Sequence, residues 1–570
     1  MTSKELRENF LNFFKRKGHK IIPSSLLTAP TDLTDSSVLF TSAGMQQFKP
    51  YYLGEKSPYG RDVVSCQKCF RTSDIEEVGI TPRHLTFFEM LGNFSFGGYF
   101  KKEAIEFAYQ FLFKELKLPL KETIFTIFEG SQEIPEDKES IEILQNLGIP
   151  KEKIQKGSKE DNFWGPTGKE GPCGPTTEIH IKGIEIWNLV FNEYFMNENK
   201  ELIPLKQKGV DTGMGLERLV MIVQKKESVF ETDLFEPIIK KISNFQFSIS
   251  NKKAMRIIAD HIKGAVFLIS EGILPSNLER GYILRRILRR AIRYGKLLNL
   301  QKNFLIPLIQ KVIEIYKDIY PEIKSKETDI LTIIQKEEEK FEKTLEIGLK
   351  KFEKLCKEGI FLTSASGQAA FDLYQSYGFP LELTQELLKE KKLTIDIENF
   401  QEVFRKHQEI SRAGLEKKFG GIGKKASYEA TKLHTATHLL HQALREILGS
   451  HIKQMGSDIT SQRLRFDFSH FQKMNSEEIK KVEDLVNQKI EEDLEIKKEE
   501  MSYQKAIKSG ALAFFKEKYP ERVSVYSIDN FSKEICAGPH INKTSELGYF
   551  KIVKEESSSA GVRRISAILK

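Results

Sequence analysis

Two pairs of potential metal ligands, about a hundred residues apart, constrain how the C-terminal part of this chain can fold. His434 and His438 stand in an apolar run of helix formers, where the four-residue spacing places both imidazoles on one helix face. Cys536 and His540 stand among Gly and Pro, where a turn can bend around an ion. Three imidazoles and one thiolate suit tetrahedral Zn²⁺. We therefore expect the fold to join both pairs around one Zn²⁺ per chain.

The alternative is that the two pairs are unrelated. A helical HxxxH often arises by chance, and Cys536 would then be a buried cysteine beside a surface histidine. HxxxH followed by CxxxH is more specific than either motif alone and favours one metal site. Four protein ligands are typical of a structural zinc, whereas an open position would make the zinc catalytic. His441, one turn beyond His438, could contact substrate or water there, although alone it is more typical of a surface histidine.

The length of 570 residues exceeds what one hydrophobic core supports and predicts about three or four domains. No apolar run is long enough to span a membrane, and the N-terminal segment lacks the apolar region of a signal peptide. The five cysteines argue against a disulfide framework and predict the reducing cytoplasm. Cys66 and Cys69 form a lone CxxC, which we interpret as free thiols, with a metal half-site as the alternative. The net charge of +8 permits a polyanionic partner without demanding one.

Changes in sequence pattern predict an α+β multidomain fold. Residues 1–245 mix helices with short β-rich runs, namely SSVLFTSAG, ETIFTIFEG and EIWNLVFNEYF, and predict a sheet. Residues 246–408 have almost continuous helical spacing of apolar residues. The Gly-rich segment 409–427 is typical of a linker, and residues 428–570 mix helix and strand again.

A run of arginines in GYILRRILRRAIRYGK is a second candidate site. Helical spacing places five guanidiniums on one side and apolar residues such as Leu284 and Ile287 on the other. Arginine suits bidentate phosphate contacts, so this side is predicted to bind a nucleic-acid backbone. The alternative is a face paired with acids from neighbouring helices, although few acids lie within four residues of the run. The arginines are Arg285, Arg286, Arg289, Arg290 and Arg293.

The N-terminal third carries a third candidate site. CFRTSDIEEVG and RHLTFFEMLGNFSFGGYF predict a strand, a loop and a strand that present Arg71, Phe87 and Phe88. VDTGMGLERLV predicts a Gly-rich turn before a helix that carries Arg218. Two arginines could bracket a triphosphate, and an aromatic ring could stack on a base, although each Phe alone is more typical of a core. The chain lacks the P-loop and Rossmann fingerprints.

These segments resemble the alanyl-tRNA synthetases over essentially the whole chain. PSSLLTAPTDLTDSSVLFTSAGMQQFKPYYLG is similar to the first class II motif region of that family. CFRTSDIEEVGITPRHLTFFEMLGNFSFGGYFKK resembles its motif 2, and VDTGMGLERL its motif 3. NFWGPTGKEGPCGPTTEIH and IWNLVFNEY resemble its amino-acid pocket, and ADHIKGAVFLISEGILPSNLERGYILRRILRRAIRYG its tRNA-binding helices. LHTATHLLHQALREILG, RLRFDFSH, EICAGPH and SSSAGVRRI resemble its zinc editing domain.

The resemblance implies a class II antiparallel-sheet catalytic domain over 1–245, a helical tRNA-recognition domain over 246–408, and a zinc-containing α+β editing domain over 428–570. It implies an aminoacyl-tRNA ligase that activates alanine with ATP and Mg²⁺ and transfers it to tRNA(Ala). It also implies hydrolytic editing of Ser-tRNA(Ala) and Gly-tRNA(Ala) at the zinc site.

The resemblance also implies residue roles. Arg71 would hold the α-phosphate and the amino-acid carboxylate, Arg218 the outer phosphate, and Phe88 the adenine ring. Asp211 would bind the alanine ammonium group. A pocket sized for a methyl group would be walled by Met45, Trp164, Val190 and Gly213. Such a pocket admits glycine, and a methylene difference contributes only about 1–3 kcal/mol to discrimination, which is a physical reason for a second, hydrolytic site.

In the helical region, the resemblance implies that Asn277 reads the G·U wobble pair of the acceptor stem. Glu382, in GFPLELT, would be its companion, although the family commonly has Asp there. The motif 2 loop RTSDIEEVG is shortened, and a short linker replaces the family's β-barrel before HxxxH. The chain ends with SSSAGVRRISAILK, without the extension associated with oligomerisation, so a monomer is expected. The alternative is a weak dimer through residues 428–570.

Two other function classes stay open. A metal-dependent hydrolase acting only on aminoacyl-tRNA would use residues 1–405 as a binding platform, and it would not catalyse alanine-dependent pyrophosphate exchange. A non-catalytic RNA-binding relative of a synthetase would be expected to have lost Arg71, Asp211 or Arg218, and all three are present.

Overall fold

The computed structural model describes residues 1–28, 39–166, 168–245, 251–407, 426–449, 451–470, 472–513, 520–559 and 562–570. The chain divides into two compact units, which are Met1–Phe352 with Tyr374–Thr384, and Glu353–Leu373 with Gln385–Lys570. The linker expected at 409–427 lies outside the described residues up to 425. The domain boundaries drawn from the sequence therefore stay predictions, and the helical region contributes to both units.

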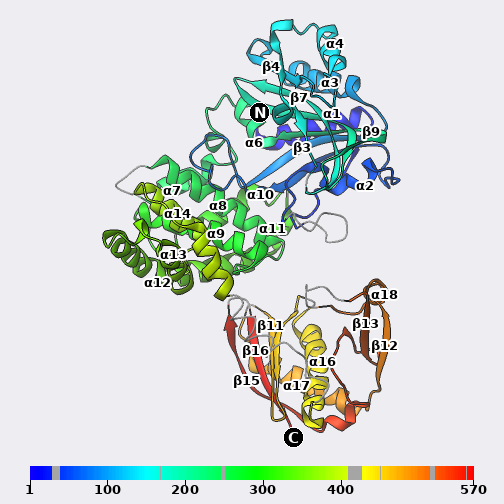
Figure 1. The fold of residues 1–570 in the computed structure, drawn as a ribbon, viewed down its shortest axis with the longest axis vertical. Helices are drawn as coiled ribbons and strands as arrows, with labels where there is room; N and C mark the ends of the chain where they lie inside the picture. Colours follow the sequence, from blue (N-terminus) through cyan, green and yellow to red (C-terminus); the bar gives the residue numbers. More distant parts are fainter. Residues whose placement is uncertain are drawn as a thin grey trace. The chain divides into compact units, whose positions relative to one another are not determined.

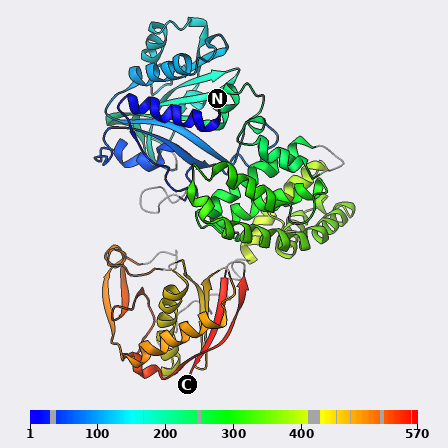
Figure 2. The same cartoon turned by 180° about the vertical axis from the view of Figure 1, so that it is seen from behind.

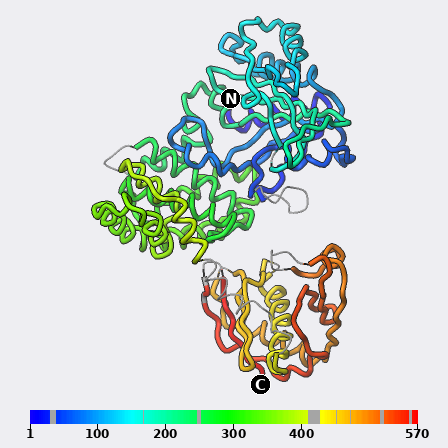
Figure 3. Tube along the Cα trace, in the orientation of Figure 1, coloured from blue at the N-terminus to red at the C-terminus, as the bar shows by residue number. Residues whose placement is uncertain are grey.

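A mostly antiparallel sheet forms the centre of the first unit, as expected for the α+β catalytic fold (Figures 1 and 3). Its strand order is β1-β2-β3-β9-β8-β7-β4-β5, with β6 paired to β7; β1–β2 and β4–β5 are the parallel pairs. The strands are β1 (Lys20–Ile21), β2 (Asp62–Phe70), β3 (Phe87–Phe96), β4 (Thr123–Phe128), β5 (Ile154–Gly157), β6 (Phe163–Trp164), β7 (Gly171–Ile181), β8 (Ile184–Met196) and β9 (Leu202–Gly215).

Helices pack around this sheet. Helix α1 begins after Thr2, whose side chain accepts a hydrogen bond from Glu5 N–H. Helix α1, dark blue in Figure 2, lies beside the sheet. It buries the rings of Phe10 and Phe14 with centroids 5.8 and 6.3 Å from that of Trp187. The helices of this region are α1 (Ser3–Arg16), α2 (Lys49–Tyr52), α3 (Lys101–Tyr109), α4 (Lys138–Asn146), α5 (Lys159–Asn162), α6 (Leu216–Val223) and α7 (Glu236–Ser243).

Two of the three β-rich runs are strands. ETIFTIFEG contains β4 and EIWNLVFNEYF lies in β8. The strand expected in SSVLFTSAG is wrong over its described residues 39–44, where a 3₁₀ turn begins at Gly44. Residues 36–38 of that run lie outside the described residues.

The region expected to be helical consists of helices that are joined by short connections. They are α8 (Lys252–Ser270), α9 (Glu279–Leu297), α10 (Leu305–Tyr316), α11 (Pro321–Ser325), α12 (Glu327–Lys357), α13 (Ser366–Tyr377), α14 (Leu381–Glu390), and a helix from residue 397 to at least 407. Helix α8 contacts the sheet through Phe267, whose ring stacks on Phe87 of β3 with centroids 3.8 Å apart. Among the described residues, no helix is long and apolar enough to cross a membrane.

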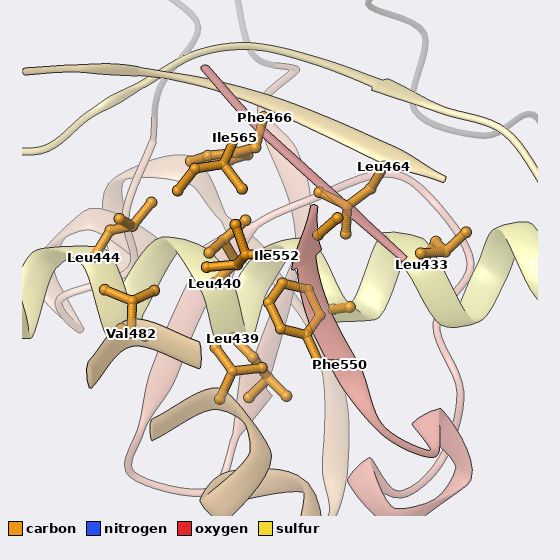
Figure 4. Packing of buried hydrophobic residues seen from close by; sticks show 14 of the residues in the cluster. Leu433, Leu439, Leu440, Leu444, Leu464, Phe466, Val482, Phe550, Ile552 and Ile565 are labelled. Carbon is orange, nitrogen blue, oxygen red and sulfur yellow. The ribbon is translucent and has the colours of Figure 1, made fainter. Parts of the chain in front are cut away.

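The C-terminal part mixes helices with two antiparallel sheets. Their orders are β10-β11-β16-β15 and β12-β13-β14. Apolar residues of α16 pack against β11, β15, β16 and α17 (Figure 4). The strands are β10 (Gln454–Ile459), β11 (Leu464–Ser469), β12 (Ile496–Ser502), β13 (Arg522–Ile528), β14 (Ser532–Ile535), β15 (Phe550–Ser559) and β16 (Val562–Leu569). The helices are α16 (Tyr428–Leu448), α17 (Ser476–Glu491) and α18 (Tyr503–Lys508).

Candidate active site and metal centre

The expected strand, loop and strand around Arg71 are present. β2 and β3 pair antiparallel from Asp62 opposite Ser95 to Phe70 opposite Phe87, so Arg71 is the first residue after β2. The Arg71 backbone N–H donates to the Thr86 carbonyl at 2.9 Å, and its Nε donates to the Ser42 carbonyl at 3.2 Å. Its guanidinium carbon lies 5.0 Å from the centre of the Phe88 ring, within cation–π range.

Arg218 stands on α6, the helix that follows β9 of the same sheet. β9 ends at Gly215 and α6 begins at Leu216, so the Gly-rich turn expected before this helix is wrong, because both glycines belong to the strand. A Cβ at Gly213 would lie 3.0 Å from Met90 Sδ. Arg218 Nη1 donates to Glu185 Oε2 at 2.9 Å and to the Glu185 carbonyl at 3.1 Å.

Arg71, Phe88, Gly213 and Arg218 line one cavity. The structure therefore brings together four residues that the sequence assigned to nucleotide and alanine binding. Arg83, His84, Asp74, Glu185 and Glu217 also line it. Arg83 and His84 were missed from the sequence, although a basic pair directly before the LTFF run was a signal for them. Three arginines beside carboxylates suit a polyanion that arrives with a cation.

Asp211 is a buried carboxyl on the strand next to this cavity. It lies on β9 opposite Val190 of β8 and Phe94 of β3, and it is 6% exposed. Burial raises the pKa of Asp211 to about 7. A buried carboxylate is most stable when a cationic group pairs with it, and an α-ammonium group can do so.

Two more of the expected pocket residues, Met45 and Trp164, belong to one apolar cluster, whereas Val190 lies on β8 and is 3% exposed. Met45 is fully buried with Met90 and Phe94, and Trp164 and Phe88 pack against this cluster. Phe88 thus connects the cluster to the cavity. That these side chains enclose an alanine methyl group stays a prediction.

Phe87 and the CxxC pair are structural. Phe87 is fully buried in its stack with Phe267, so the expectation that it is presented with Phe88 is wrong. Cys66 and Cys69 are free and buried on β2, and their spacing of three directs them to opposite faces of the strand. The alternative of a metal half-site there is wrong, and burial raises the pKa of Cys69 to about 12.

The five arginines of α9 do not form the expected open stripe. Leu284 and Ile287 are buried as expected, but Arg285, Arg289, Arg290 and Arg293 are also buried, at 4–8% exposed. The side chain of Arg286 is 13% exposed. The expected exposed arginine face is therefore wrong. The alternative, pairing with acids from neighbouring helices, holds for Arg285 and Arg289, and whether any of the five arginines contacts tRNA stays a prediction.

The partners of these arginines come from distant parts of the chain. Glu337 of α12 lies 3.2 Å from Arg285 and 2.6 Å from Arg289. Arg290 Nη1 donates to the Ile75 carbonyl at 2.7 Å. Counting acids only within four residues of the run could not find such partners.

Arg286 joins the loop between β2 and β3 to the start of α14. Arg286 lies 2.6 Å from Glu76, in the loop between β2 and β3, and 3.2 Å from Glu382 at the start of α14. The Tyr282 hydroxyl also donates to Glu382, at 2.6 Å. Asn277 is exposed, and its Oδ1 accepts a hydrogen bond from Arg285. The arginines thus hold the two residues expected to contact tRNA, and whether Asn277 and Glu382 do so stays a prediction.

The two ligand pairs in the C-terminal part meet. His434 and His438 lie on α16, and candidate ligand atoms of His434, His438, Cys536 and His540 all lie within 4.8 Å of one another. Cys536 follows directly after β14, and its backbone N–H donates to the Ser524 carbonyl of β13 at 3.1 Å. A Cβ at Gly538 would lie 2.3 Å from His434 Cε1, so only glycine lets this loop approach α16 so closely.

Each imidazole turns one nitrogen away from the cluster. The Nδ1 atoms of His434 and His540 lie 3.1 Å from the Pro539 carbonyl and from the Thr435 hydroxyl. His438 Nδ1 lies 3.3 Å from a carboxylate oxygen of Glu534. All three Nε2 atoms are thereby left for the cluster, and that of His540 is buried without a protein partner. This donor set fits a zinc ion.

The electrostatics of the cluster favour a thiolate. Burial opposes ionisation of Cys536, but hydrogen bonds from His434, His438 and His540 lower the pKa of its thiol to about 2. Burial lowers the pKa of His540 to about 4, which keeps this imidazole neutral. Burial lowers the pKa of His438, but Glu534 and Cys536 raise it to about 9, so a metal would have to displace a proton from this imidazole. A thiolate and neutral imidazoles are the forms that bind a metal.

His441 is not a surface residue. It is fully buried, and its Nδ1 lies 2.8 Å from Glu534 Oε1. Both expectations, contact with substrate or exposure to solvent, are therefore wrong for His441. No motif in the sequence pointed to Glu534, which stands only two residues before Cys536.

Comparisons with known proteins agree with these sites. The pattern of the family "tRNA synthetases class II (A)" matches residues 5–455, and that of the "Threonyl and Alanyl tRNA synthetase second additional domain" matches residues 523–566. The alanine–tRNA ligase of Borreliella afzelii is 48% identical over 596 residues, which cover 100% of both chains.

More distant relatives carry the same name. The alanine–tRNA ligase of Treponema denticola is 47% identical, over 100% of this chain and 99% of the relative. That of Thermotoga maritima is 40% identical, over 100% of this chain and 80% of the relative. The chain therefore belongs to the alanyl-tRNA synthetase family of class II aminoacyl-tRNA synthetases.

Proposed function

We propose that this chain is an alanine–tRNA ligase. It activates alanine with ATP to alanyl-adenylate and transfers the alanyl group to the 3′-terminal adenosine of tRNA(Ala). The observation that carries this proposal is the cavity shared by Arg71, Phe88 and Arg218, with Asp211 on the strand beside it. ATP, alanine and tRNA are the partners, Mg²⁺ accompanies ATP, and the free cysteines suit the reducing cytoplasm.

Adenylate formation makes three demands on this site. Arg71 binds the α-phosphate and the alanine carboxylate, and so stabilises the charge that develops as they join. Arg218 binds the leaving pyrophosphate end by exchanging its Glu185 partner for phosphate oxygens. Phe88 stacks with adenine, while Asp211 holds the ammonium group and thereby orients the attacking carboxylate.

The alanine pocket is small because Met45, Trp164 and Val190 wall it and Gly213 admits Met90. Side chains larger than a methyl group are excluded by overlap. Glycine fits, and serine is one hydroxyl larger, so differences in binding of about 1–3 kcal/mol leave errors to be removed.

We infer that the C-terminal part removes these errors. His434, His438, Cys536 and His540 hold one Zn²⁺, and when bound it supplies a Lewis acid beside the mischarged ester. The family match over residues 523–566 supports this assignment.

Recognition of tRNA(Ala) belongs to the helical region. Asn277 reads the G·U wobble pair of the acceptor stem and Glu382 assists it, because Arg285, Arg286 and Tyr282 hold both side chains in place. In this proposal the buried arginines position the readers and do not touch the phosphates.

Alanine-dependent exchange of pyrophosphate into ATP tests the proposal directly. We expect exchange with alanine, weaker exchange with serine and glycine, and none with leucine. Absence of alanine-dependent exchange in folded protein would instead favour a hydrolase that acts only on aminoacyl-tRNA. Deacylation of Ser-tRNA(Ala) by the same protein tests the editing part separately.

A further inference from the structure

We infer that Glu534 is a positioning residue for the zinc site, which it serves by orienting His438 and by balancing the charge of the ion. His441 holds Glu534 in place for this role. The inference rests on the zinc site of the proposed function and adds residues that do not themselves bind the metal. Glu534 lies at the end of β14, two residues before Cys536, and is 4% exposed.

The Glu534 carboxylate lies between two histidines of α16. One Glu534 oxygen, Oε2, lies 3.3 Å from His438 Nδ1, and the other, Oε1, lies 2.8 Å from His441 Nδ1. This contact to His438 has the distance of an ion pair and is not a hydrogen bond. A carboxylate in this place favours the proton of His438 on Nδ1, which leaves the lone pair of Nε2 for the ion. The Nδ1 atoms of the other two imidazoles face only a backbone carbonyl and a hydroxyl.

The charge of the zinc site also supports this role for Glu534. Zn²⁺ with three neutral imidazoles and one thiolate carries a net charge of +1, and two of the four ligands, His434 and His438, are buried while the other two are half-buried. A net charge in such a place is costly unless an opposite charge accompanies it. The buried carboxylate of Glu534 brings the sum to zero. Residues 534 and 536 are two apart in an extended segment, so one strand delivers both negative charges to the same side.

His441 stands three residues after His438 on α16, so the two imidazoles lie on neighbouring positions of one helix face and share a single carboxylate. His441 is fully buried, with its ring 5.5 Å from that of Phe466. An imidazole whose Nδ1 lies 2.8 Å from Glu534 Oε1 holds the carboxylate in this orientation.

The test compares metal binding by the full-length wild type, Glu534→Gln and His441→Leu. Zn²⁺ affinity is measured by competition with a chromophoric chelator, and the Co²⁺-substituted proteins are compared by their visible spectra. Glu500→Gln is the matched control, because Glu500 is an exposed acid on β12 of the same sheet. We expect Glu534→Gln to bind Zn²⁺ about 10–100-fold more weakly, with altered Co²⁺ bands. His441→Leu should lose less affinity, and Glu500→Gln none.

Thermal unfolding of the metal-free proteins separates positioning from general destabilisation. The inference requires that Glu534→Gln lose affinity while its metal-free unfolding temperature stays near that of the wild type. If the wild type binds Zn²⁺ and both variants bind it equally well with unchanged Co²⁺ spectra, the inference is wrong and the zinc site stands. If the wild type binds no Zn²⁺, the zinc site itself is wrong and the inference falls with it.

Discussion

The nucleotide cavity and the zinc cluster hold their key side chains in opposite ways. In the cavity, Arg218 pairs with Glu185, whose side chain is 39% exposed, and Arg71 rests on a backbone carbonyl and the Phe88 ring. In the cluster, two ligands are buried and two are half-buried, and the Nδ1 atom of each imidazole lies within 3.3 Å of a protein oxygen. A site for a transient polyanion needs arginines that can exchange partners, whereas a site for a resident ion needs ligands with one orientation.

The largest effect is expected at Arg71. Arg71→Ala should lower alanine-dependent pyrophosphate exchange on the order of 10²–10³-fold, because one charge-stabilising contact is lost in the transition state. Arg61→Ala, at an exposed arginine before β2, is the control. Exchange at the wild-type rate in Arg71→Ala would show that Arg71 does not stabilise adenylate formation, and the contrast between the cavity and the zinc cluster would lose its support from Arg71.

The next largest effect is expected at Cys536 in the zinc cluster. Cys536→Ala should lower Zn²⁺ affinity on the order of 100-fold or more, since even partners outside the ligand set contribute 10–100-fold. If the site edits, this variant stays folded, charges alanine normally and accumulates Ser-tRNA(Ala). Local unfolding of the variant, together with a wild type that does not deacylate Ser-tRNA(Ala), would show that the metal serves structure only.

A smaller effect is expected at Asn277. Asn277→Ala should reduce charging of tRNA(Ala) about 10–100-fold, the value of roughly 1–3 kcal/mol for a specific base contact. Replacing the wobble pair by a Watson–Crick pair should reduce charging by the wild type to a similar level. Normal charging by Asn277→Ala would contradict base reading by this residue.

The smallest effect is a pH dependence. Because the pKa of Asp211 is raised to about 7, its carboxylate is lost as the pH falls below 7, and kcat/KM for alanine should drop about tenfold per pH unit there. The raised pKa acts in the opposite direction on the free energy of unfolding, because burial favours the protonated, uncharged carboxyl group in the folded state. The free energy of unfolding gains from Asp211 as the pH falls from about 7 towards 4, and this gain should be missing in Asp211→Asn.

The sequence predicted the metal ligands because both pairs stand in short motifs with clear local geometry. It predicted β4, β8 and the helical region from apolar spacing. It failed where tertiary contacts decide the outcome, as for Phe87, which stacks on a helix far along the chain. The prediction of an exposed arginine face on α9 was wrong for the same reason, because the partners Glu337 and Glu382 are not neighbours of these arginines in the sequence. Glu534 and His441 could not be found from spacing, because their pairing depends on how β14 meets α16.

The guanidinium of Arg286 spans two segments that are three hundred residues apart in the chain, the loop with Glu76 and the start of α14 with Glu382. Neither segment can be displaced on its own without breaking an ion pair to that shared group. The part of the molecule expected to meet the acceptor stem is thus mechanically tied to the loop that begins with Arg71. Because both ion pairs share the Arg286 guanidinium, a displacement of one segment strains the contact to the other.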